Sequence, residues 1–421
     1  MSLPFFISRH LSLRSSGQSG STGILVAVTG VSLSVIVMII SISVMMGFRH
    51  EIRQKVIGFD SQISIGVRPV VTSDTVTDIA SQTLISRRDL LPVYDVLPRD
   101  AKVNFSVRQP AILKTPDNFS GSVIKGVDAD YDWSFIRGNL VEGVVPDFNS
   151  DSTMYHIVVS RTLSRTLGLE LGDKLDAYFL GNDTYRARRL KISGIYDTHF
   201  SEYDRNMVFG SLGMLQQVAG VPDSCATLVE INGLPDDDAI DATASAIANT
   251  YIEQLYTGKS DRHYAVVNIH DSAAIFFNWL LLLDTNVSVI LTLMSLLTAL
   301  TLVSSLFILI LRRVNMIGIL KALGASNRMI RYTFVILATR LLIVGLLIGN
   351  VIGVGLLYVQ RATGLVPLDP DAYYLDHVPV MIDWGTIAIL NISIIAVSFL
   401  VLLIPSAIVT TIPPSRAINY E

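Results

Sequence analysis

Four long runs of apolar residues interrupt an otherwise polar chain. The first covers residues 23–48 and has no charged side chain, whereas a bilayer core about 30 Å thick requires about 20 residues of helix. The second covers 275–311, with Asp284 as its one charged residue, and the third and fourth cover 333–358 and 384–408. The pattern predicts four transmembrane helices.

The lengths of the first two runs add detail. The first is too long for the apolar core of a cleaved signal sequence, about 7 to 15 residues, and is interpreted as an uncleaved anchor. The second has 37 residues, which as a helix would be about 55 Å long and must protrude from the membrane. Asp284 lies near its beginning and is expected in a stalk above the bilayer.

The segment between the first two runs alternates polar and apolar residues. Strand-like stretches include "SQISIGV", "VNFSVRQPAIL", "RRLKISGIYD" and "CATLVEING", and helical ones "SRTLSRTLGL" and "DDDAIDATASAIANTYIEQLY". An α+β domain is predicted, with one of two subdomains assembled from both ends of the segment, 61–115 and 227–269. Because Cys225 is the only cysteine, an intramolecular disulfide is excluded.

Charges in the connecting loops set the orientation. The loop after the second run carries five basic residues and no acidic one, whereas residues 361–383 carry one arginine and four aspartates. The basic loop is therefore cytoplasmic, and the N-terminus is cytoplasmic too. The predicted divisions are a cytoplasmic N-terminal amphipathic segment (1–22), the first span (23–48), an extracytoplasmic α+β domain (49–274), the second span with its stalk (275–311), a cytoplasmic helix (312–332), the third span (333–358), a short outer loop (359–383), the fourth span (384–408) and a cytoplasmic tail (409–421).

Composition agrees with a membrane protein and excludes several functions. Half of the residues are hydrophobic, 16% are charged and the net charge is −4, so nucleic acid is not an expected partner. No metal-binding, serine-hydrolase or redox motif is found. The stretch "TGKS" at 257–260 is not a phosphate-binding loop, because Glu253 occupies the position of the required glycine. We expect a non-catalytic chain without a metal or cofactor of its own.

The basic loop contains a short amphipathic helix. Its apolar stripe is expected on one face, with Gly318, Lys321 and Ala322 elsewhere, and consists of Met316, Ile317, Ile319, Leu320 and Leu323. Gly324 is suited to end this helix and Ser326 to cap the next one. A helix of about eight residues is not stable alone, so something must pack on it. Lipid headgroups and a cytoplasmic protein are the two candidates.

At this loop the sequence resembles a known family. "RRVNMIGILKALGASNRMIRYTFV" is similar to the cytoplasmic coupling helix of FtsX-like/MacB-like permeases of ABC transporters, which docks on an ATPase subunit. The resemblance implies that the contact to the ATPase is made by Asn315, Met316, Ile317, Gly318, Ile319, Leu320, Lys321, Ala322, Leu323, Gly324, Ala325 and Ser326. Where the family often has Glu or Asp, this chain has Asn315, so one polar contact is expected to differ.

Other segments resemble one branch of that family, the lipoprotein-releasing-system permeases (LolC/LolE-like). The similar segments are "FFISRHL", "VMMGFRHEIRQKVIGFDSQISI", "IKGVDADY", "VVSRTLSRTLGLELGDKL" and "IPSAIVTTIPPSRAINYE". In that branch the first span ends in a comparable motif and leads into an "ILGF" strand. Some members carry an extended hook that recruits a carrier, whereas the corresponding turn here, "LGNDTYRARR" at 180–189, predicts a short hook or none.

The resemblance implies a multi-pass protein of the bacterial inner membrane with its large domain in the periplasm. It implies a dimer with a second permease subunit, identical or homologous, and a dimer of separate cytoplasmic ATPases that bind ATP and Mg. By mechanotransmission, such a complex extracts a lipoprotein client from the membrane lipid and passes it to a periplasmic lipoprotein carrier. Two alternatives remain: an efflux or signalling permease of the same family, and a membrane-anchored enzyme with an unrecognised periplasmic site.

Two further sets of residues are singled out. Flexible methionines and aromatic rings accept apolar shapes of many kinds, so a cavity for acyl chains is a hypothesis for Met45, Met46, Phe48, Phe276, Phe277 and Trp279. Glycines at four-residue spacing allow another helix to approach closely. This role is assigned to Gly345, Gly349 and Gly353, and packing within the subunit is favoured over a dimer interface.

Overall fold

The computed structural model describes residues 18–68, 83–128, 130–148, 150–180 and 185–408. The chain folds into two compact units, which we call the membrane unit and the periplasmic unit. The periplasmic unit comprises His50–Asn278 and Leu368–Asp376, and the membrane unit comprises the rest. Residues 1–17 of the predicted N-terminal segment and the predicted tail, 409–421, lie outside the described residues.

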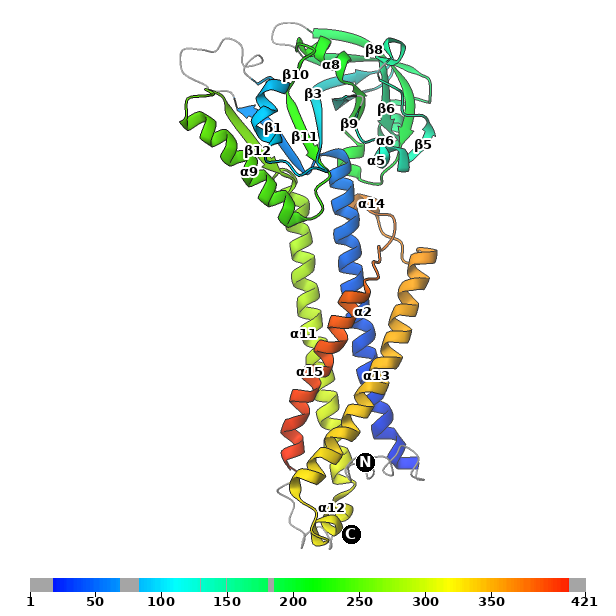
Figure 1. Ribbon diagram of the computed structural model, residues 1–421. Coiled ribbons are helices and arrows are strands. Elements are labelled where there is room, and N and C mark those ends of the chain that lie inside the picture. The colour runs from blue at the N-terminus through cyan, green and yellow to red at the C-terminus, as the bar shows by residue number, and fades with distance from the viewer. Residues whose placement is uncertain (1–17, 69–82, 129, 149, 181–184, 409–421) are drawn as a thin grey trace. The chain divides into compact units, whose positions relative to one another are not determined.

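Among the described residues, four helices are long and apolar enough to cross a membrane, which confirms the predicted number of spans (Figure 1). The helices are α2 (Gln18–Phe59), α11 (Ala274–Leu311), α13 (Asn327–Thr363) and α15 (Trp384–Ile408), with the short α12 (Val314–Ala322) between α11 and α13.

Helix α2 continues eleven residues beyond the predicted end of the first span, from residue 48 to Phe59. The added turns are polar but rich in good helix formers, and Gln54 Nε2 lies 2.9 Å from His50 Nε2 one turn earlier. The stretch "IGF" that the resemblance placed in a strand is therefore the last turn of a helix. The first strand begins later, at Ile63.

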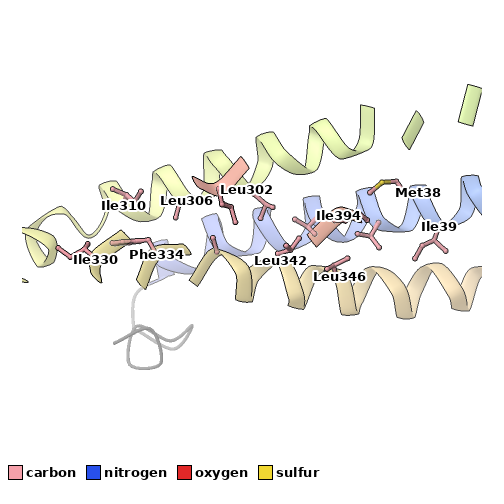
Figure 2. Packing of buried hydrophobic residues seen from close by; sticks show 14 of the residues in the cluster. Met38, Ile39, Leu302, Leu306, Ile310, Ile330, Phe334, Leu342, Leu346 and Ile394 are labelled. Atoms are coloured by element: carbon pink, nitrogen blue, oxygen red, sulfur yellow. The ribbon is translucent and has the colours of Figure 1, made fainter. Parts of the chain in front are cut away.

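Apolar side chains from all four long helices and from α12 form the core of the membrane unit. Figure 2 shows Ile310, Ile330 and Phe334 converging at one end of this core, and Met38 and Ile39 further along it. A partly buried polar pair joins α13 and α15. Asn350 and Asn391 each donate a side-chain hydrogen bond to the other, at 2.8 and 2.9 Å, so each amide has a partner on the neighbouring helix.

The periplasmic unit is built on a sheet of ten strands, counted over the described residues. These are β1 (Ile63–Arg68), β3 (Lys102–Lys114), β4 (Phe119–Val127), β5 (Leu140–Gly143), β6 (His156–Ser160), β7 (Lys174–Leu180), β8 (Tyr185–Tyr196), β9 (Met207–Ser211), β11 (Leu228–Asn232) and β12 (His263–Asn268). A separate pair joins β2 (Ile85–Ser86) to β10 (Cys225–Ala226).

Six of the ten strands close into a ring, because β3 pairs with β4, β4 with β9, β9 with β6, β6 with β8, β8 with β7, and β7 with β3. Strand β3 also pairs with β11 through its first five residues. The order β12-β1-β11-β3 then continues the sheet outside the ring. The predicted assembly from both ends of the segment is confirmed, since β1 lies between β11 and β12, but both parts share one sheet.

Short helices cover and connect the strands. They are η1 (Arg87–Leu90), α4 (Leu91–Tyr94), α5 (Ser134–Gly138), η2 (Asp151–Thr153), α6 (Arg161–Leu167), α7 (Ser201–Asp204), α8 (Leu212–Ala219), α9 (Asp237–Tyr256), α10 (Ile269–Ser272) and α14 (Pro370–Tyr373). Helix α9 packs against β12 (Figure 1). Side chains cap several of them as expected for helix starts; Asp236 accepts from Ala239 N at 2.8 Å. Strands β7 and β8 pair until Leu180 is opposite Tyr185, and residues 181–184 of the turn for which a short hook or none is predicted lie outside the described residues.

Candidate functional site

Local sequence defines both ends of α12. Gly324 has φ +90°, a conformation that favours glycine, and directly follows the last turn of this helix. Ser326 accepts a hydrogen bond from Met329 N at 3.3 Å and caps α13. Both predicted signals are confirmed, and they hold α12 as a separate helix between two spans.

One face of α12 packs against its own bundle. Ile317 is fully buried in the core that contains Ile310, Ile330 and Phe334 (Figure 2), and Leu320 packs against the same core. The prediction that Gly318 faces away from the apolar stripe is wrong, because this glycine is buried beside Ile317. The partner that stabilises so short a helix is therefore, in the first place, the membrane unit itself.

The opposite face of α12 leaves apolar side chains open. Ile319 is 55% exposed and Leu323 is 79% exposed, and four-residue spacing places them one turn apart. Asn315 and Ala322 are exposed as well, and so is Arg328 in the next helix. We call Asn315, Ile319, Ala322 and Leu323 the open face of α12. Two large apolar side chains beside a basic one form a surface suited to a protein groove.

The residues hypothesised to line an acyl-chain cavity fall in both units. In the membrane unit, Phe48 packs edge-on against Trp279 with ring centroids 5.9 Å apart, while Met45 and Met46 are half-buried. In the periplasmic unit, Phe276 lies 4.9 Å from the Phe200 ring. Phe277 lies 4.6 Å from His270. The rings thus make two separate sets of contacts, and the common cavity remains a hypothesis.

The three glycines of α13 lie against α2 of the same chain. A Cβ atom added at Gly345 would lie 2.7 Å from Val31 Cγ1, and one at Gly349 would lie 2.7 Å from Val35 Cβ. At Gly353 the nearest atom would be Ile36 Cα at 3.5 Å. Ser32 Oγ also donates to Gly345 O at 3.0 Å. The glycines thus permit backbone approach between two helices of one subunit.

Sequence reasoning missed a buried cluster of charges at the end of α2. It consists of two anions and two cations, which we call the ion joint: Asp60, Arg108, Lys125 and Glu230. Lys125 Nζ lies 2.8 Å from Glu230 Oε2 and donates to Phe59 O at 2.8 Å. Arg108 lies 3.1 Å from Glu230 Oε1 and 2.6 Å from Asp60 Oδ1. The side chains of Lys125 and Glu230 are completely buried.

The electrostatics of the ion joint favour the ionised form of both carboxylates, whereas burial lowers the pKa of Lys125 against the opposing effect of Glu230. Burial would raise the pKa of Glu230, but the charges of Lys125 and Arg108 outweigh it and the pKa is lowered. Burial also opposes ionisation of Asp60, yet Arg108 and a hydrogen bond from Tyr203 hold its pKa below the usual range. Ser106 Oγ donates to Glu230 Oε1 at 2.9 Å. Both carboxylates are therefore ionised at neutral pH.

Aromatic rings enclose the residue before the ion joint. Phe59 is fully buried and stacks on Tyr203 with centroids 4.7 Å apart. Phe135 meets it edge-on at 5.4 Å. The neighbouring Gly58 has no room for a side chain, because an added Cβ would lie 2.3 Å from the Phe135 ring. The last turn of α2 is thus held tightly in the periplasmic unit.

The periplasmic unit also binds the backbone of the outer loop. Lys55 Nζ donates to Thr198 O at 2.6 Å and to Tyr374 O at 2.9 Å, and the Tyr374 ring lies 5.1 Å from that of Phe200. Over the described ranges no group of three or more His, Cys, Asp or Glu side chains is arranged to hold a metal.

Comparison with known proteins agrees with this architecture. The MacB-like periplasmic core domain family matches residues 24–250, and the FtsX-like permease C-terminal family matches residues 288–414. The chain is 21% identical over 412 residues to the lipoprotein-releasing system transmembrane protein LolC of Xylella fastidiosa (strain Temecula1), covering 94% of this chain and 93% of that protein. It is 23% identical over 421 residues to the LolC of Neisseria meningitidis serogroup B, covering 94% of each.

Two solved structures also align with part of the chain. The extracellular domain of the transporter YknZ is 14% identical with a TM-score of 0.33, covering 49% of this chain and 99% of that one. The periplasmic region of MacB from Actinobacillus actinomycetemcomitans is 11% identical with a TM-score of 0.32, covering 53% and 97%.

The family matches span both units. The MacB-like match alone covers more than half of the 421 residues. The four long helices of the described residues have the length and composition needed to cross a membrane. The large domain is periplasmic and the helices lie in the inner membrane, as predicted. The chain belongs to the FtsX-like/MacB-like family of ABC transporter permeases, whose members are non-catalytic membrane subunits.

Proposed function

We propose that this permease extracts lipoproteins from the inner membrane and passes them to a periplasmic carrier. ATP hydrolysis would occur in a separate cytoplasmic ATPase that binds ATP and Mg, and a second permease subunit would complete the membrane part. The observation that supports this proposal most is the length of the similarity to two LolC proteins, which extends over 94% of the chain and so includes both units.

The geometry of α12 supports coupling to an ATPase. Its open face presents Ile319 and Leu323 outward, while Ile317 is fixed in the bundle core. A protein that binds the open face would therefore push on a helix whose other face cannot slide freely, because close-packed interiors transmit displacement. The ends of α11 and α13 that contact Ile317 would move with it.

Substitutions on the open face of α12 test this coupling. Ile319→Glu and Leu323→Glu place a charge on exposed positions, so the chain should stay folded but lose the ATPase during copurification. Leu365→Glu is the matched control, since Leu365 is 72% exposed but lies in the outer loop. We expect the control to retain the ATPase.

Release itself is measured with a fluorescent triacylated lipoprotein in proteoliposomes that contain the permease and its ATPase. ATP and a purified carrier are added, and lipoprotein in the soluble fraction is counted. The proposal predicts ATP-dependent release by the natural chain and the control, and none by the two open-face variants. An ATPase that binds while no lipoprotein leaves the membrane would contradict lipoprotein extraction and favour the efflux or signalling alternative.

A further inference from the structure

The ion joint connects one helix end to three different strands. Arg108 belongs to β3, Lys125 to β4 and Glu230 to β11, while Asp60 follows the last residue of α2. Strand β11 lies outside the closed ring, whereas β3 and β4 belong to it. A single cluster therefore holds the end of α2 to both parts of the sheet.

The pairing register shows that the four charges act as one group. Arg108 and Lys125 are direct partners across β3 and β4, where like charges repel. Glu230 relieves this repulsion, because its Oε1 faces Arg108 and its Oε2 faces Lys125. Removing this carboxylate alone would leave two adjacent cations, the fully buried Lys125 and the partly buried Arg108, with one anion.

Bonds from the two cations to α2 are directional. Lys125 donates to Phe59 O, one of the carbonyls that a helix end leaves without a partner inside the helix, and a cation there also interacts favourably with the helix dipole. Arg108 contacts the Asp60 carboxylate, which also accepts a hydrogen bond from the Tyr203 hydroxyl. These directional bonds add to the apolar packing around Phe59 and fix the position of the helix end more firmly.

We propose that the ion joint makes the last turn of α2 and the sheet one rigid body, so that movement of α2 reaches the whole periplasmic domain. This inference rests on the proposed function, which requires motion driven in the cytoplasm to act on a lipoprotein in the periplasm. Asp60, Arg108, Lys125 and Glu230 are positioning residues. They determine how much of the helix movement arrives at the sheet.

Replacing one buried ion pair by two apolar side chains tests the rigidity of the ion joint without lowering the stability of the fold. Lys125→Met/Glu230→Met removes one charge of each sign and keeps Arg108 with Asp60, and such replacements of buried ion pairs are often neutral or stabilising. The matched control is Lys102→Met/Asp132→Met, which removes the ion pair with a 3.0 Å separation and side chains 60% and 48% exposed. We expect both variants to keep the natural melting temperature and ATP hydrolysis within about twofold.

Lipoprotein release should then distinguish the two pairs. The Lys125→Met/Glu230→Met chain, which we call the joint variant, should release the triacylated lipoprotein about tenfold more slowly than the natural chain. Such a loss is within the range usual for coupling between sites, and the control should release the lipoprotein at the natural rate. Natural release by a folded joint variant would overturn the proposal. Should that variant not fold, Asp60→Asn carries the same test at the edge of the cluster, where Asp60 is 15% exposed.

A distance measurement tests the rigid body without any client. Nitroxide labels are placed on Gln54→Cys and Lys114→Cys, both exposed in the periplasmic unit, in a Cys225→Ser chain diluted with unlabelled chain. In the natural chain, pulsed electron paramagnetic resonance should give one narrow distribution of the distance between the labels, and an ATP analogue should leave it unchanged. In the joint variant the distribution should be broader. A nucleotide-dependent distance in the natural chain, or no broadening in the variant, would overturn the proposal. If the natural chain gives one narrow distance but releases no lipoprotein, the result would instead count against the proposed function alone.

Discussion

Close approach of α13 to α2 predicts that Gly349→Ala destabilises the membrane unit. The added Cβ would lie 2.7 Å from Val35 Cβ and 3.0 Å from Ser32 O. Gly355 lies six residues later in the same helix, and a Cβ there would meet nothing within 4 Å. Gly355→Ala is therefore a matched control with the same chemical change in open space.

The size of the effect follows from the contact distance. Carbon atoms pack best at about 3.5–4.0 Å, so the new methyl group requires the helices to separate by about 1 Å, and such a gap forfeits a quarter to a half of each dispersion contact along the interface. Overpacking of this kind costs about 1–3 kcal/mol. Alanine is a better helix former than glycine by about 1 kcal/mol, which offsets part of this cost for Gly349→Ala and is the whole effect for Gly355→Ala.

The assay is reversible unfolding of the purified permease in mixed detergent micelles, followed by circular dichroism. Gly349→Ala should unfold at a lower denaturant fraction than the natural chain, and Gly355→Ala at an equal or higher one. Equal stabilisation by both substitutions would refute the reasoning, because it would mean that no helix approaches Gly349 closely. The packing role of Gly345 and Gly353 would then lose its basis as well.

Three further predictions concern other contacts. Asn350→Leu should lower the unfolding free energy by about 1 kcal/mol because Asn391 loses its partner, and Asn350→Leu/Asn391→Leu should recover most of it in the same assay. Burial raises the pKa of Asp204 to about 6, above its unfolded value of about 3.9, so stability should fall as pH rises from about 4 to 6; Asp204→Asn should lack this slope in pH-dependent thermal unfolding. Leu320→Glu should lower the melting temperature, whereas Leu323→Glu should not, since only Leu320 packs against the bundle core.

Local signals in the sequence predicted the membrane unit well. Each predicted span contains enough apolar residues for a helix to cross the bilayer, so composition alone identifies the spans. Gly324 and Ser326 act within a few residues of themselves, and both have the predicted role. The side of α12 that is buried was harder to predict, because Met316, Ile317, Ile319 and Leu320 are all apolar and periodicity does not tell which neighbour covers which side chain.

The sequence indicated that the two ends of the periplasmic segment assemble together, but it did not predict which strands pair. The closed ring depends on β3 pairing with β7, and the strand pattern of a ring is the same as that of an open sheet. The ion joint left a faint signal, since Lys125 and Glu230 are the only charged residues in strands β4 and β11. Their partnership becomes visible only when the register places β11, β3 and β4 side by side.

The two candidate coupling elements, α12 and the end of α2, differ in how much of their surface is covered by contacts within the chain. Helix α12 buries Ile317 and leaves Ile319 and Leu323 exposed, and we propose that another protein covers its open face. The end of α2 is enclosed by aromatic rings, and its ion joint balances two anions with two cations. A helix end enclosed in this way gives a displaced helix a fixed point of attachment. Substitutions on the open face should therefore change whether the ATPase binds, whereas substitutions in the ion joint should change how fast lipoprotein is released.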